Sequence, residues 1–160
     1  MLKGAQVPKD QLFQEPERAQ PTKLLPATNG FVFDLGGRHL EVIATPGHTK
    51  GGICLLDKEH KLLFTGDDNN TLQWQFLEQS TTLEAYLRTL EALDARKDFD
   101  TLLPGHGGAL DKGFIAEQIA CARSILDGSC KDEPYKSFAG ESRLCRHGRA
   151  AIAFDPKKLR

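Results

Sequence analysis

The sequence predicts an α/β fold in which a mixed β-sheet carries helices on one face. Its 160 residues, of which 39% are hydrophobic and 27% charged, suit one globular domain. Short apolar segments bounded by turn residues predict four strands in two hairpins, and helical periodicity then occurs twice, each time followed by another strand. The resulting order, β-β-β-β-α-β-α-β without an internal repeat, is typical of a mixed sheet covered by helices.

Two predicted hairpins open the folded region. Residues 31–35 and 40–44 are apolar runs joined by Gly36-Gly37, and residues 52–56 and 61–65 flank the polar turn at residues 57–60. Apolar runs on either side of a short turn predict antiparallel strand pairs.

Two later segments have the spacing of amphipathic helices. Residues 82–96 repeat apolar side chains every three or four positions, with Ser80 or Thr81 available as the N-cap. Residues 114–126 form a second helix that ends at Gly128. The remaining chain is predicted as loop, apart from two short strands at residues 99–103 and 150–154. Both helices are expected on one face of the sheet, which leaves the other face bare.

Residues 1–29 contain four prolines among charged and amide side chains and lack apolar periodicity, so they predict an extended arm preceding a domain at residues 30–160. The formal net charge of −1 gives no field that would attract nucleic acid or anionic lipid. No stretch reaches the roughly 18 apolar residues that a membrane-spanning helix needs. We therefore expect a cytoplasmic protein that binds neither nucleic acid nor membrane.

The four cysteines show neither the density of a secreted scaffold nor a C-x-x-C pair, so reduced thiols are expected. Cys54, within an apolar run, is predicted to be a buried small side chain. Cys130, Cys145 and His147 allow the alternative of a small metal knuckle. Structural zinc sites usually show two closely spaced ligand pairs, and one pair is visible here, which disfavours that alternative.

Three residues suited to chemistry follow the ends of predicted strands: His48, Asp67 and His106. The opposed strands of the second hairpin return the chain to the sheet edge where His48 was left, which places Asp67 beside it. A helical crossover normally leads to a parallel strand, so His106 leaves the sheet at the same edge. Glycine lets these loops turn sharply, and it flanks the three residues at Gly47, Gly66, Gly105 and Gly107.

Two imidazoles and one carboxylate at one sheet edge predict a metal site. Zinc accepts this ligand set, and so do iron and manganese, so the ligand types alone do not choose the metal. The remaining histidines that bear on this point, His39 in a strand and His60 in a turn, are predicted to be solvated.

The segments Thr45-Pro46-Gly47-His48-Thr49-Lys50-Gly51, Leu63-Phe64-Thr65-Gly66-Asp67 and Leu103-Pro104-Gly105-His106-Gly107 resemble, in order, the third, fourth and fifth motifs of the metallo-β-lactamase superfamily. The resemblance implies an αββα sandwich of which this chain is the C-terminal half. It also implies that His48, Asp67 and His106 bind a metal pair, with Asp67 bridging the ions as the catalytic aspartate. In that family a hydroxide held by the metals attacks an ester, thioester, lactone, lactam or phosphoester of a small-molecule substrate.

The sequence departs from the family in lacking the first signature, His-x-His-x-Asp-His, anywhere in its 160 residues. Two hypotheses follow. The first is a metal-dependent hydrolase that is incomplete without an N-terminal half, with one or two divalent ions, zinc first among them. The second is a non-catalytic remnant that binds metal weakly or acts as a partner-binding subunit. With three ligands available, one ion held by all three is the expected occupancy.

A half-sandwich is expected to associate, as a homodimer or with a separate N-terminal half, because its bare sheet face would otherwise be exposed. The residues predicted on that face are Phe31, Phe33, Val42, Ile43, Ile53, Leu55, Leu62 and Phe64.

Substrate identity is not encoded in any recognisable motif. Trp74 and Phe76, which follow Asp67, are interpreted as core residues in preference to the mouth of a pocket. Arg143, Arg146 and Arg149 suit either a substrate anion or an exposed basic face.

Overall fold

A computed structural model describes residues 27–160, so residues 1–26 of the predicted arm lie outside the described part of the chain. Its elements are β1 (Val32–Asp34), β2 (His39–Ala44), β3 (Ile53–Asp57), β4 (Leu62–Gly66), β5 (Leu72–Gln75), α1 (Leu83–Ala95), β6 (Thr101–Pro104), β7 (Leu110–Asp111), α2 (Phe114–Leu126), β8 (Glu133–Ser137), β9 (Gly140–His147) and β10 (Ala150–Phe154).

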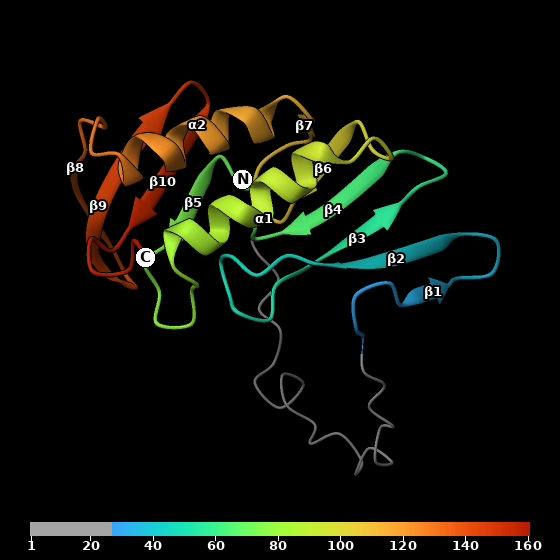
Figure 1. Cartoon of the computed structure of the whole chain (residues 1–160). Coiled ribbons are helices and arrows are strands. Elements are labelled where there is room, and N and C mark those ends of the chain that lie inside the picture. The colour runs from blue at the N-terminus through green and yellow to red at the C-terminus, as the bar shows by residue number, and fades with distance from the viewer. Residues whose placement is uncertain (1–26) are drawn as a thin grey trace, which may run out of the picture.

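The strands form two sheets where the sequence predicted one. One sheet has the order β1-β2-β3-β4-β6-β7 and the other the order β5-β10-β9-β8 (Figure 1). The second sheet was missed because β5, β8 and β9 do not have the apolar pattern of strands. The sequence of β5 is Leu-Gln-Trp-Gln, and both of its glutamines are buried. The hairpin of β8 and β9 is mostly polar and charged, and segments of that composition read as loops.

The six-stranded sheet confirms the predicted hairpins and crossover. β1 and β2 pair antiparallel, as do β3 and β4, and β2 pairs antiparallel with β3. β6 then pairs parallel with β4 after the chain crosses over through α1. Asp67 and His106 therefore leave neighbouring parallel strands at the same edge of the sheet.

Both helices match their predicted positions closely. The cap of α1 is Thr82, whose side chain accepts a hydrogen bond from the Ala85 backbone N–H at 3.3 Å, so the predicted caps Ser80 and Thr81 are wrong. α2 runs from Phe114 to Leu126 as predicted, and Gly128 follows it with a φ of 77°. That conformation favours glycine and ends the helix.

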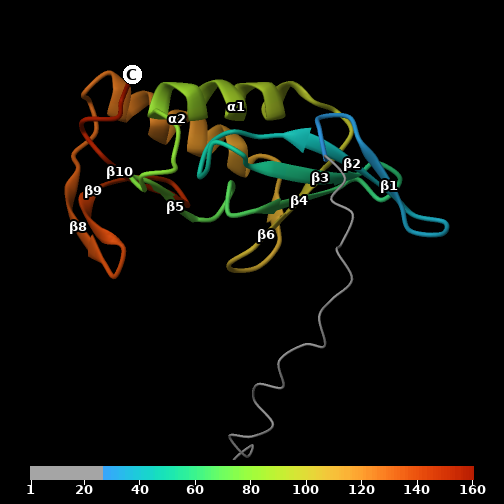
Figure 2. The same ribbon diagram turned by 90° about the horizontal axis from the view of Figure 1, so that it is seen from below.

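The two helices lie on the same side of the sheets, as Figure 2 shows. Their apolar stripes pack on the sheet side chains that point toward them, and this layer is the core. Its largest fully buried members are Tyr86, Phe99, Phe114, Leu56, Leu63, Leu83, Leu90, Leu93, Leu102, Ile115 and Ile152.

The face of the six-stranded sheet opposite the helices is partly exposed. Two of the residues predicted on this bare face, Ile43 and Val42, are instead buried. Ile43 pairs with Cys54, and both are buried among the core residues, because alternate strand residues point to opposite faces. Val42 is fully buried, although it was predicted on the bare face. Ile53 remains 41% exposed and Phe33 36% exposed, so apolar surface does persist there.

The structure joins Cys130 and Cys145 in a disulfide, with 6.2 Å between their Cα atoms, so the expectation of four reduced thiols is wrong. The predicted loop is in fact the β8–β9 hairpin, whose fold brings Cys145 next to the chain leaving α2. Cys54 and Cys121 are free and buried, as expected for Cys54. Disulfides are typical of oxidising compartments. The predicted cytoplasmic location stays a prediction.

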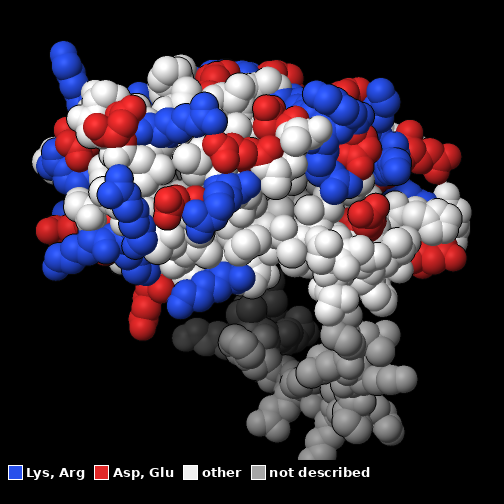
Figure 3. All heavy atoms as spheres, viewed as in Figure 1, with Lys and Arg blue, Asp and Glu red and all other residues white. Residues whose placement is uncertain are grey.

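Charged side chains of both signs are mixed over the helix-bearing face (Figure 3). Arg143, Arg146 and Arg149 all have carboxylate partners: Arg143 with Asp132 at 2.8 Å, Arg146 with Glu133 at 3.3 Å, and Arg149 with Asp111 and Glu117, both at 2.6 Å.

No helix within residues 27–160 is long and apolar enough to cross a membrane.

Asp57, at the end of β3, carries a local ion network. Burial opposes its ionisation, but hydrogen bonds from His60 and Arg38 outweigh that effect and lower the pKa of Asp57 to about 2. His60 is thus 53% exposed but bonded to Asp57 at 2.9 Å, which corrects the prediction that it is merely solvated. His39 remains 62% exposed, in line with its prediction.

We predict that Asp57→Asn lowers stability most at neutral pH. Because the folded pKa lies below the ordinary value, the ionised carboxylate favours the native state above about pH 4, and this contribution is lost as the pH falls toward 2. Urea unfolding should show the gap between parent and variant narrowing below pH 4. Asp100→Asn is the control, since its carboxylate is 67% exposed beside Lys61. A gap that stays constant down to pH 2.5 contradicts the prediction.

Candidate functional site

His48, Asp67 and His106 line one cavity of about 650 Å³, so the structure brings the three predicted residues together. They come from the loops after β2, β4 and β6. Gly66, just before Asp67, has a φ of 51°, and Gly107, just after His106, has a φ of 94°. Both glycines therefore adopt the left-handed conformation that other residues avoid, which explains the glycines at these positions.

Asp67 and His106 are adjacent in the cavity, with 3.3 Å between Asp67 Oδ1 and His106 Nε2. Asn70 holds both partners. Its side-chain amide donates to Asp67 Oδ1 at 3.1 Å, and its side-chain oxygen accepts a hydrogen bond from the His106 backbone N–H at 3.1 Å. The side chain of His106 is 80% exposed, so Asn70 fixes the backbone from which that ring projects.

His48 is held by its ring and by its backbone. Nδ1 lies 2.9 Å from the carbonyl oxygen of Trp74, and because a carbonyl can only accept, Nδ1 carries the proton. The neutral ring therefore presents an unprotonated Nε2. This is the arrangement commonly found in metal-binding histidines, whose other nitrogen donates to a carbonyl or carboxylate. Ser80 donates to the His48 carbonyl at 2.8 Å and fixes the loop further.

Asp68 is a buried carboxylate directly beneath the His48 loop. It accepts hydrogen bonds from the Thr45 hydroxyl at 2.7 Å and from the His48 backbone N–H at 3.1 Å. Burial raises the pKa of Asp68 to about 6, while these two donors favour the ionised form. The side chain thus ties the loop after β2 to the loop after β4.

Helix side chains hold the loop after β4 in place. Tyr86 of α1 donates to the Asp68 carbonyl at 2.7 Å, and Gln118 of α2 donates to the Tyr86 hydroxyl at 3.1 Å. Asn69 in turn donates to the Gln118 side-chain oxygen at 2.6 Å. The sequence did not predict this network. Tyr86 occupies the apolar stripe of its helix, so it was predicted to be a core side chain rather than a hydrogen-bond donor. The polar run Asp67-Asp68-Asn69-Asn70 after an apolar strand was the available signal.

Part of the cavity lining is apolar. Leu72, Trp74, Leu77, Phe138 and Ala139 line it, and they come from β5, from the chain after it, and from the β8–β9 turn. Trp74, half-buried, thus lines the cavity as well as packing on Phe76 and Tyr135, which corrects its interpretation as a core residue alone. Phe76 belongs to that small packed cluster, in agreement with the core interpretation.

The donor types in the cavity suit a divalent ion, with two imidazoles and one carboxylate. The assembly is partial: Asp67 and His106 are adjacent, and His48 shares their cavity with its lone pair fixed by Trp74. Across residues 27–160, no three His, Cys, Asp or Glu side chains are grouped closely enough to hold an ion. The fit therefore lies in the donor chemistry and the shared cavity.

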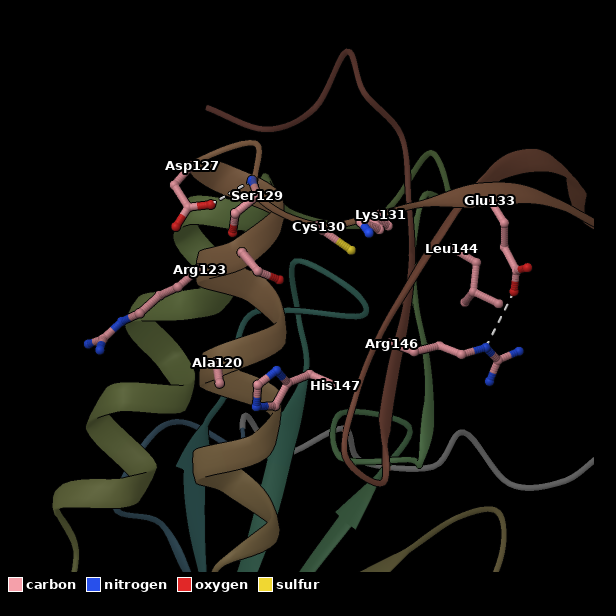
Figure 4. A pocket seen from close by; sticks show the side chains of 11 residues that line it. Ala120, Arg123, Asp127, Ser129, Cys130, Lys131, Glu133, Leu144, Arg146 and His147 are labelled. Atoms are coloured by element: carbon pink, nitrogen blue, oxygen red, sulfur yellow. Dashed lines mark hydrogen bonds and ion pairs between the residues drawn. The ribbon is translucent and has the colours of Figure 1, made fainter.

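A second cavity of about 590 Å³ lies at the end of α2 and includes Cys130 and His147 among its lining residues. In Figure 4 the His147 ring and the Cys130 sulfur lie apart, and the Arg123 side chain points away from the other residues drawn. The Cys130 sulfur is committed to Cys145. The alternative of a metal knuckle at these residues is therefore wrong.

The sequence profile of the metallo-β-lactamase superfamily matches residues 7–106 of this chain. The match covers more than half of the chain and includes all three loops of the cavity. This chain therefore belongs to the metallo-β-lactamase superfamily, as its three motifs predicted.

Two relatives and one solved structure illustrate the membership. Acyl-coenzyme A thioesterase MBLAC2 of Gallus gallus is 40% identical over 91 residues, which are 54% of this chain and 32% of the relative. Thioesterase pkgB of Emericella nidulans is 34% identical over 103 residues, which are 61% of this chain and 29% of the relative. The chain thus spans about a third of the length of these relatives.

The crystal structure of a metallo-β-lactamase family protein from Thermus thermophilus superposes with a TM-score of 0.54 at 24% identity, over 72% of this chain and 41% of that one. At this identity the similarity shows the shared fold, and it confirms the predicted fold class.

We predict that Gly52→Ala destabilises the protein by about 2 kcal/mol, since overpacking a filled site costs roughly 1–3 kcal/mol. A Cβ at Gly52 would lie 2.5 Å from the Thr45 carbonyl oxygen and 2.8 Å from Asp68 Oδ2. Urea unfolding measures the loss. Gly51→Ala is a matched control one residue away, because nothing lies within 4 Å of its added Cβ. Equal stability of the two variants would refute the packing argument.

Proposed function

We propose that this chain is part of a metal-dependent hydrolase that cleaves thioesters. The observation that supports this most is the convergence of His48, Asp67 and His106, each on a superfamily motif, in one cavity. Support for a thioester substrate comes from relatives that are named thioesterases. Zinc is the proposed ion, since its ligand preferences include this donor set, and iron or manganese would accept the same residues.

Two of the chain's own residues have defined roles in such a site. His48 offers Nε2 because the Trp74 carbonyl holds the proton on Nδ1. Asp67, oriented by Asn70, offers a carboxylate beside His106 and is the proposed catalytic aspartate. A bound divalent ion would activate water at neutral pH and stabilise negative charge developing on the thioester oxygen.

We propose that further ligands come from a second polypeptide segment, either a second copy of the chain or a separate N-terminal half. The described chain offers three ligand residues in this cavity, and of these Asp67 and His106 are adjacent. Apolar surface at Phe33 and Ile53, which are 36% and 41% exposed on the face away from the helices, gives such a partner a place to pack.

A second candidate function is a non-catalytic subunit that binds metal weakly or binds a partner. The observation in its favour is that Asp67 and His106 are 46% and 80% exposed, so the paired donors stand largely in solvent. Metal sites that support catalysis usually restrict water around the ion.

We predict that the chain binds zinc weakly and that Asp67→Ala and His106→Ala each weaken this binding by at least about ten-fold, since loss of a ligand costs no less than loss of a residue that supports one. Titration in chelator-free buffer measures the affinity. His39→Ala is the matched control, because that histidine is 62% exposed and lies outside the cavity. Unchanged affinity in both site variants would remove the proposed metal site.

The same preparations separate the two candidate functions. Slow, zinc-dependent release of thiol from an acyl-coenzyme A, followed with a thiol-reactive dye and lost in Asp67→Ala, supports the hydrolase. Zinc binding without any thiol release favours the non-catalytic subunit.

We predict that the chain self-associates at micromolar concentration through the exposed face of β1–β3. Ile53→Asp should shift the equilibrium toward monomer, because it places a charge on apolar surface that the contact would bury. Light scattering measures the mass. A parent chain that is folded and monomeric at these concentrations would contradict self-association and leave a separate N-terminal half as the proposed partner.

A further inference from the structure

The apolar side of the cavity is not explained by the metal donors. Leu72 and Trp74 of β5, Leu77, and Phe138 with Ala139 at the β8–β9 turn form it. Water activation and charge stabilisation require none of these side chains. A cavity that combines an apolar wall with polar donors is what a substrate with one apolar part and one reactive polar part would fit.

Phe138 is the most unusual member of this wall. It is 96% exposed, far above the usual value for phenylalanine, and it is the most exposed of the large hydrophobic residues in the described chain. Its ring is nevertheless placed against the wall, with 5.3 Å between its centroid and that of Trp74. The ring thus lines the cavity while it remains almost fully exposed, and burying it would require a ligand or another chain.

The turn that carries Phe138 is held in place at both ends. β8 and β9 pair over five residue positions from Glu133–Leu144 to Ser137–Gly140, and the Cys130–Cys145 disulfide joins the start of this hairpin to its second strand. Within the hairpin, Tyr135 accepts a hydrogen bond from the Trp74 indole N–H at 3.1 Å. Phe138 thus projects from a fixed support.

Trp74 connects the apolar wall to the donors. Its carbonyl oxygen accepts the hydrogen bond from His48 Nδ1 at 2.9 Å, while its indole lines the cavity. The residue that holds the His48 ring therefore also contributes its indole to the apolar lining of the same cavity.

The charge of the wall decides which part of a thioester it suits. Within residues 27–160, the side chains that line this cavity include no Lys or Arg. A phosphorylated carrier such as coenzyme A needs cationic partners for its phosphates, so it is a poor match for the wall. An alkyl or aryl acyl group needs only apolar contact, which the wall provides.

We propose that Leu72, Trp74, Leu77 and Phe138 form a subsite for the apolar acyl group of the thioester, and that Phe138 is a residue that determines preference for long acyl chains. This proposal rests on the proposed thioesterase function. It adds the part of the substrate that the cavity recognises and the residue that sets the preference.

The test uses Trp74 as a reporter, because it is the one tryptophan in the sequence. S-dodecyl-coenzyme A and S-methyl-coenzyme A are thioethers that cannot be hydrolysed, and each is titrated below its micelle concentration into the full chain with a chelator present. We expect the dodecyl probe to shift Trp74 emission to shorter wavelength and to bind at least ten-fold more tightly than the methyl probe.

Variants assign this effect to Phe138. We expect Phe138→Ala to weaken binding of the dodecyl probe about ten-fold, the lower end of the range for losing one apolar contact in a pocket, and Phe138→Leu to weaken it about two-fold. Leu35→Ala is the matched control, since Leu35 is a 60% exposed apolar residue outside the cavity, and its binding should equal that of the parent. Circular dichroism confirms the fold of each variant.

Equal affinity for the two probes, or unchanged dodecyl binding in Phe138→Ala, overturns the subsite. The chelator keeps this result separate from the metal-dependent function. If the dodecyl probe binds as expected but no acyl-coenzyme A is hydrolysed when zinc is supplied, the subsite stands and the thioesterase fails. If acyl-coenzyme A is hydrolysed with no preference for acyl-chain length, the thioesterase stands and the subsite fails.

Discussion

The buried carboxylate of Asp68 is the contact on which the placement of the His48 loop against the Asp67 loop depends. Its side chain accepts hydrogen bonds from Thr45 and the backbone of His48, and its backbone carbonyl is held by Tyr86. A buried charge without partners would be strongly unfavourable, and here two hydrogen bonds from the loop after β2 offset that cost. Gly47 lets the chain approach the Tyr86 ring, since an added Cβ there would lie 2.6 Å from it. Gly52 lets the chain approach the Asp68 carboxylate, since an added Cβ there would lie 2.8 Å from Oδ2. The donors are positioned by the fold itself.

This support reaches both helices through neutral polar groups. Gln118 contacts the Tyr86 hydroxyl and the Asn69 side chain, so α2 touches the loop after β4 although it lies far away in sequence. Asn70 then donates a hydrogen bond to Asp67 and accepts one from the backbone N–H of His106, so it positions both residues. Networks of buried hydrogen bonds are favourable when their members are satisfied, and they specify one geometry. The packing of two helices on the sheet thereby determines where a carboxylate and an imidazole meet at its edge.

The sequence was sufficient to predict five of the six strands of the larger sheet, all but β7, together with both helices and the loops that carry His48, Asp67 and His106, because each depends on local signals. Hairpin turns, helical periodicity and glycine-flanked strand ends all act over fewer than about fifteen residues. The second sheet could not be predicted in the same way. β5 buries Gln73 and Gln75, and β8 and β9 carry mostly polar residues, so their pairing follows from tertiary contact with β10. The disulfide was missed for the same reason, since Cys130 and Cys145 approach only once that hairpin has formed.

The second sheet also couples the placement of His48 to the proposed acyl subsite. β5 contributes the Trp74 carbonyl that fixes the proton on His48, and the same residue contributes the indole that lines the cavity. A displacement of β5 would therefore change the imidazole and the apolar wall together. β5 is held by parallel pairing with β10, and β10 pairs in turn with β9, whose hairpin carries Phe138. Since one continuous sheet supports the wall, the cavity keeps its shape only while the pairing of β5 with β10 is intact.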